Sequence, residues 1–148
     1  MAADKPAKAS KPRNSTFSAE EQAAIQEVRR ERKKGGKADG EADLLAKIAE
    51  MDGSDKQMAE RIHAILKQVA PHLAPKTWYG MPAWADANGK AVCFFTPAAK
   101  FKERYASLGF NANAQLDDGN MWPTSFALLK ITDAEESRIA ALVKQAAG

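Results

Sequence analysis

The sequence feature that most limits the fold is an Asn-Gly pair at positions 88 and 89, between two runs of strand-forming residues. Asn-Gly is the strongest short-range signal for a β-hairpin, because a type I′ turn needs a positive φ at both central residues. We therefore predict strands over residues 83–87 and 90–96, joined by a two-residue loop. This register pairs small residues with large ones, Ala87 with Lys90, Ala85 with Val92 and Ala83 with Phe94.

Patterns on both sides of this hairpin predict an α+β fold. Three helices are expected to begin at capping boxes, which are Ser18 with Glu21, Ser54 with Gln57, and Thr132 with Glu135. Apolar periodicity predicts a further helix over residues 41–51 and more strands at 78–81, 105–110 and 126–131, with Pro82 ending the first. This order predicts a mainly antiparallel sheet of four to five strands packed by N- and C-terminal helices, a two-layer sandwich. Because both hairpin faces are largely apolar, we expect part of the sheet to be covered twice.

The composition divides the chain into three parts. Residues 1–16 have no apolar periodicity and are expected to be a disordered basic tail, followed by a charged helix to about Lys34 and a Gly-rich joint over 17–40. Residues 41–148 are the expected folded domain. Residues 1–40 hold ten Lys and Arg against six Asp and Glu, so the folded body is nearly neutral and nucleic acid is not an expected partner. The single cysteine, and the absence of an apolar leader or membrane-length run, predict a cytoplasmic protein with no membrane partner.

Several motifs resemble a known family. They are Trp78-Tyr79-Gly80-Met81-Pro82, the aromatic hairpin, residues 105–110, Met121-Trp122-Pro123 and the closing helix. From residue 41 to the C-terminus the chain resembles the YdhG-like family (domain of unknown function 1801), in a long branch with an extra N-terminal helix. The resemblance implies an antiparallel sheet flanked by N- and C-terminal helices. One branch of the family is a frataxin-like iron chaperone, so the resemblance also implies iron delivery and transient Fe(II) binding, without family-wide catalytic residues.

Metal binding would require clustered oxygen ligands, which Fe(II) prefers. The best candidates are Asp117 and Asp118, which fit a surface turn equally well, and we favour the turn. His63 and His72 lack the i, i+4 spacing of a helical metal pair. His63 also lies off the apolar stripe of its helix and is expected to face solvent.

Aromatic residues provide the other candidate site. The residues expected to bind a ligand are Lys76, Trp78, Tyr79, Met81, Trp84, Arg104 and Trp122. The same aromatic residues fit the core of a small sheet protein, except Trp122, which lies in an irregular loop. Cys93 is expected to be a buried, inert thiol.

We interpret the chain as a non-enzymatic binding or carrier domain, because its sequence carries no recognisable catalytic motif. Two alternatives stay open. One is a protein-interaction module that uses the N-terminal helix to bind a partner or a second copy. The other is a small-molecule binder that uses the Trp84 and Trp122 region.

Overall fold

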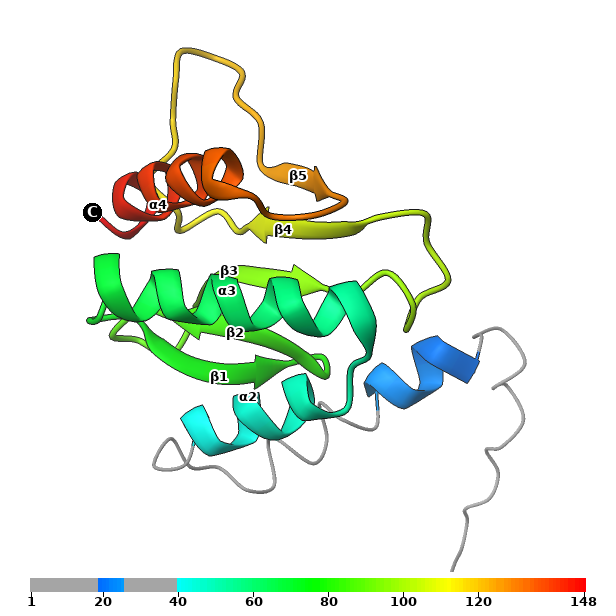
Figure 1. Cartoon of the computed structure of the whole chain (residues 1–148). Helices are drawn as coiled ribbons and strands as arrows, with labels where there is room; N and C mark the ends of the chain where they lie inside the picture. Colours follow the sequence, from blue (N-terminus) through cyan, green and yellow to red (C-terminus); the bar gives the residue numbers. More distant parts are fainter. Residues whose placement is uncertain (1–18, 26–39) are drawn as a thin grey trace, which may run out of the picture.

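The computed structural model describes residues 19–25 and 40–148 of the chain, and these form the α+β fold that the sequence predicts (Figure 1). The expectations for the disordered tail, the Ser18 cap, the helix end near Lys34 and most of the Gly-rich joint lie outside the described residues. None of the helices in the described ranges is long and apolar enough to cross a bilayer.

The elements follow the chain as helices, five strands and a closing helix. Residues 19–25 form a short helical segment. The labelled helices are α2 (Gly40–Ala49), α3 (Gly53–Val69) and α4 (Asp133–Ala147). The strands are β1 (Ala74–Trp78), β2 (Met81–Ala85), β3 (Ala91–Thr96), β4 (Ala106–Phe110) and β5 (Ser125–Leu128). They pair in the order β1-β2-β3-β4-β5, each antiparallel to its neighbour.

Helices α2, α3 and α4 pack on one face of the sheet, which we call the covered face (Figure 1). Its core includes Trp84, Phe95 and Leu108 from the strands, together with Leu44, Ile62 and Val143 from the helices. Successive side chains of a strand point to opposite faces, so the neighbours of these strand residues belong to the other face. No labelled helix lies on that face in Figure 1, yet Met81, Ala83 and Ala85 on it are 8%, 0% and 1% exposed, so the expectation of a doubly covered sheet stays a prediction. We call this second surface the open face.

The central hairpin forms with a longer loop than predicted. Ala83 pairs with Phe94 as expected, but the loop has three residues, because the Asp86 N–H donates to the Lys90 carbonyl at 2.9 Å. Only Gly89, at φ +81°, has a positive φ in this loop, as in a type I turn followed by a left-handed glycine. The type I′ prediction is therefore wrong.

The Asp86 side chain explains the longer loop. Its Oδ1 accepts hydrogen bonds from the backbone N–H groups of Asn88 at 2.9 Å and Lys90 at 3.1 Å, a local bond that favours this turn. Ala85 consequently pairs with Ala91, so the predicted partners Val92 and Lys90 for Ala85 and Ala87 are wrong. A register shift between Trp84 and Ala85 then leaves Val92 as the extra residue of a bulge, which restores the expected register.

A type I′ geometry occurs at the preceding turn instead. Tyr79 and Gly80 join β1 to β2 with φ of 54° and 77°, and Trp78 pairs with Met81 across them. The predicted strand over residues 78–81 is therefore a hairpin turn. Pro82 does not break β2. It pairs with Thr77 of β1, and the pairs between β2 and β3 begin one residue later, at Ala83.

The helix starts are only partly as predicted. The Thr132–Glu135 capping box is confirmed at the start of α4. The box predicted at Ser54 is wrong, because α3 already begins at Gly53. Asp55 in the first turn of α3 is 6% exposed and accepts the backbone N–H groups of Ala98 at 3.1 Å and Ala99 at 3.0 Å. This carboxylate ties the start of α3 to the loop after β3.

Candidate functional site

An aromatic cluster marks the open face at the end of β1. The Trp78 ring lies edge-on to Tyr79, with centroids 4.8 Å apart, and is tilted against Phe94 at 4.9 Å. Met81 lies beside them, where its sulfur accepts the Thr96 hydroxyl at 3.3 Å. These contacts hold the Trp78 indole on a surface that no described helix covers.

Tyr79 occupies a conformation that a large side chain rarely adopts. A left-handed φ is uncommon for any residue except glycine and costs on the order of 1–3 kcal/mol for a bulky side chain. Tyr79 nevertheless has φ 54° and is 43% exposed, so burial of its ring does not offset that cost in full. Such an outlier supports a functional interpretation of the surface beside it.

Phe94 rests on a glycine of the neighbouring strand. Gly109 pairs with Phe94 across β3 and β4, and a Cβ atom at position 109 would lie 2.4 Å from the Phe94 Cζ. Only the missing side chain lets the ring lie flat on β4, a pairing that shields a strand glycine. The position of Trp78 depends in turn on this ring.

A shallow groove of about 610 Å³ extends from Trp78 to the tip of the β2–β3 hairpin. It is lined by Trp78, Gly89, Lys90, Ala91, Asn111 and Asn113, among others. We call it the open-face groove. Its volume is within the usual range for ligand sites, and it combines an aromatic wall with a few polar groups.

Hydrogen bonds fix the polar wall of this groove. The Asn113 amide donates to Asp86 Oδ2 at 2.9 Å and to the Lys90 carbonyl at 3.2 Å, and the Asn111 amide donates to the Ala91 carbonyl at 3.0 Å. The Asn113 bond, followed by the backbone N–H of Lys90, holds the pKa of Asp86 below its ordinary value. The hairpin tip is therefore ordered before any ligand arrives.

The sequence-predicted ligand residues separate into two groups. Lys76, Trp78 and Met81 share the open face, with Tyr79 in the turn beside them, and the Lys76 ammonium donates to the Gly89 carbonyl at 3.3 Å. Trp84 is 1% exposed within the core on the covered face.

The other two predicted residues also lie apart from the groove lining. Trp122 packs against the core from its loop. The Arg104 guanidinium lies 5.1 Å from the Tyr105 ring in the loop before β4.

The predicted metal residues lie on an exposed loop. Asp117 and Asp118 are both exposed, and residues 19–25 and 40–148 contain no group of three or more His, Cys, Asp or Glu that could hold a metal ion. Glu135 is engaged in its cap, where the Thr132 hydroxyl lowers the pKa of its carboxyl group. Iron binding at Asp117 and Asp118 stays a prediction.

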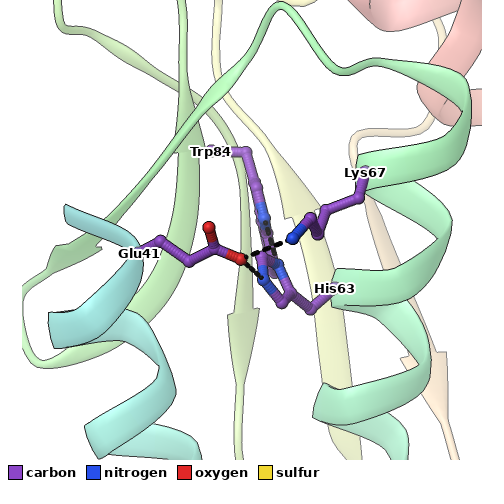
Figure 2. A network of polar contacts seen from close by, with 4 residues as sticks. All are labelled: Glu41, His63, Lys67 and Trp84. Atoms are coloured by element: carbon purple, nitrogen blue, oxygen red, sulfur yellow. Dashed lines mark hydrogen bonds and ion pairs between the residues drawn. The ribbon is translucent and has the colours of Figure 1, made fainter. Parts of the chain in front are cut away.

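A polar network that runs from the core at Trp84 and His63 to the exposed Lys67 joins α2, α3 and β2 (Figure 2). The Trp84 indole donates to His63 Nδ1 at 3.2 Å, while His63 Nε2 lies 2.9 Å from Glu41 Oε2, which also accepts the Lys67 ammonium at 2.9 Å. His63 is only 6% exposed, so the expectation that it faces solvent is wrong. Helix α3, which carries His63, packs against α2 as well as against the sheet. Its buried surface is therefore wider than one apolar stripe.

The donors in this network determine the His63 tautomer. An indole N–H can only donate, so His63 Nδ1 must accept, and the ring proton lies on Nε2 facing Glu41. Both ring nitrogens are therefore occupied within the protein. Glu41, His63 and Trp84 resemble a carboxylate–histidine catalytic pair in their order, but the nitrogen that would act on a substrate is bonded to Trp84 in the core.

Asn111 and Asn113 were not predicted from the sequence as site residues. Two features of the sequence indicated an aromatic sheet face. Lys76 and Trp78 alternate along β1, and Phe94 was expected opposite Ala83. Nothing in the sequence indicated that the two asparagines would reach the hairpin tip. Comparisons of the chain with family models, curated proteins and solved structures find no match.

Proposed function

We propose that this protein is a non-enzymatic binding domain whose ligand lies in the open-face groove against Trp78. The observation that carries the proposal is the cluster of Trp78, Tyr79 and Phe94 on a sheet face without a described helix. Large aromatic side chains gathered outside the core typically mark a binding surface. The strained Tyr79 turn supports the same conclusion.

The chemistry of the described residues favours binding over catalysis. Burial raises the pKa of the Cys93 thiol to about 12, so this sulfur does not supply a thiolate nucleophile. Both nitrogens of His63 are engaged in the core network. The groove itself presents an indole, amides and a lysine, which orient a ligand.

Nuclear magnetic resonance of the full chain tests the proposal directly. A panel of common metabolites is titrated while the indole N–H of Trp78 and the side-chain amides of Asn111 and Asn113 are followed. A ligand of the groove shifts these resonances together, and Trp78→Leu removes the response. Leu129→Ala, which changes an exposed residue elsewhere, leaves it intact. A panel that moves none of the three signals contradicts the proposal.

Iron delivery by a YdhG-like protein is a separate proposal that rests on the family resemblance. Its test is an anaerobic Fe(II) titration of the protein and of a variant with both Asp117→Asn and Asp118→Asn. Binding that is unchanged in the variant would reject these two ligands.

The interaction-module alternative also stays a prediction. Residues 19–25 already contact the domain, because Glu20 Oε2 lies 2.8 Å from the Lys102 ammonium and raises its pKa. Light scattering of the full chain and of a form starting at Glu41 would reveal any self-association through the N-terminal segment.

A further inference from the structure

We infer that the open-face groove binds a nucleotide, with its base stacked on Trp78 and its phosphate at the lysines of the hairpin tip. This inference rests on the proposed function and adds the chemical class of the ligand. Three properties of the groove lead to it, which are the charge around it, the ring at one end and the acceptors along its side.

The charge around the groove is positive. Side-chain alternation places Lys76, Trp78 and Met81 on the open face, together with the strand positions Ala83, Ala85, Phe94 and Thr96, and none of these is acidic. Lys90 is exposed at the rim of the groove. The Lys76 ammonium donates to the carbonyl of Gly89, the residue just before Lys90. Asp86 also lies at the hairpin tip, where its carboxylate accepts hydrogen bonds from Asn88, Lys90 and Asn113, so two lysines stand against one carboxylate there. An anionic group is therefore favoured at the hairpin tip.

The opposite end of the groove offers a planar aromatic surface. Trp78 is held between Tyr79 and Phe94, and no described residue accepts a hydrogen bond from its indole N–H. A fixed indole beside cationic side chains is the arrangement on which bases stack, since every base has a π-face. An anion without a ring would leave this surface unused.

The side of the groove offers hydrogen-bond acceptors. The amide nitrogens of Asn111 and Asn113 are committed to backbone and carboxylate oxygens of the hairpin. This orientation leaves their side-chain carbonyl oxygens without a donor among the described residues. Amino groups of a base or hydroxyl groups of a ribose fit such acceptors. A nucleotide combines the aromatic ring, the hydrogen-bond donors and the anionic group that these three features favour. A neutral sugar would make no use of the lysines.

Calorimetry and nuclear magnetic resonance with AMP, GMP, CMP and UMP test this class on the full chain. At least one nucleotide is expected to bind and to shift the Trp78 indole and both asparagine amides. Its nucleoside, which lacks phosphate, and ribose 5-phosphate, which lacks the base, are each expected to bind about tenfold more weakly or worse. Added salt is expected to weaken the binding of the nucleotide and to leave the binding of the nucleoside unchanged.

Two substitutions and two controls separate the site from non-specific attraction. Trp78→Leu and Lys90→Gln are each expected to weaken nucleotide binding about five- to tenfold or more. Lys90 is exposed at the tip, so its variant stays informative even if the Trp78 variant folds poorly. Lys144→Gln on α4 and Leu129→Ala, both outside the groove, leave the affinity unchanged. Nucleotide binding that survives both groove substitutions overturns the inference.

A second experiment, with ten-residue single-stranded oligonucleotides, distinguishes a free nucleotide from a single strand as the ligand. Equal affinity per site for a mononucleotide and an oligonucleotide identifies a free nucleotide, and much tighter oligonucleotide binding identifies a single strand. If the nucleotides leave the groove resonances unmoved while another metabolite shifts them, the ligand class is wrong and the proposed function stands. If no compound shifts them, both are wrong.

Discussion

Replacing Gly109 by alanine tests the physical basis of the open face. The added Cβ would lie 2.4, 2.8 and 3.0 Å from three atoms of the Phe94 ring, Cζ, Cε2 and Cε1, which are the nearest heavy atoms. Carbon atoms in contact are separated by roughly 3.5–4.0 Å. The ring must therefore shift by about 1 Å or more, away from β4 and against Trp78.

The expected cost combines two opposing terms. Overpacking of this kind destabilises by about 1–3 kcal/mol, whereas alanine is favoured over glycine in a strand by about 0.5–1 kcal/mol. Gly109→Ala should then lower the free energy of unfolding by about 0.5–2 kcal/mol, and the melting temperature by roughly 2–6 °C. In a Phe94→Leu background all three crowded ring atoms are absent, so the same change should become neutral or stabilising.

Urea denaturation of the four proteins of this cycle measures the coupling. We expect a coupling free energy of about 1–3 kcal/mol between positions 94 and 109. The Trp78 indole resonance should move in Gly109→Ala, because its neighbour is displaced. An equal loss of stability in both backgrounds would refute the reasoning, since the clash would then not involve the Phe94 ring.

Other predictions follow from the core contacts. The hydrogen bond from Lys67, and then that from His63, lower the pKa of Glu41, so its stabilising contribution is present above about pH 4 and is lost as the pH falls further. Acid titration followed by circular dichroism should show a shallower loss of stability for Glu41→Gln. Asp55→Ala should cost about 2–3 kcal/mol in urea denaturation, because two N–H groups lose a charged acceptor, and Asp55→Asn should cost about half of that. Cys93, whose pKa is raised to about 12, should react with a disulfide reagent at pH 8 only in denaturant, and labelling at native conditions would contradict its burial.

The sequence predicted the layers of this fold well because apolar periodicity and capping are local properties. The Thr132 box and the Ala83–Phe94 pair are examples. Turn types were less predictable. Asn-Gly favours a type I′ turn on propensity, yet the Asp86 carboxylate stabilises the competing three-residue loop, and the left-handed turn falls at Tyr79-Gly80.

The candidate site was only partly predictable, because strand patterns do not reveal which apolar face a helix will cover. The sequence favoured Trp78 and Trp84 equally as ligand-binding residues. Only tertiary packing shows that Trp78 lies at the surface and Trp84 in the core. His63 was assigned wrongly for a related reason. Its burial depends on α2 crossing beside α3, a contact between segments that the spacing along one helix does not encode.

The bulge at Val92 has a mechanical consequence for the hairpin. The extra residue of the 87–89 loop and the extra residue at Val92 cancel, so every pair from Trp84 with Cys93 onward keeps its alignment. Shortening the loop by one residue while deleting Val92 would leave the sheet beyond it in place. The length of the tip that carries Lys90 can thus change without altering the strand pairs that carry Trp78.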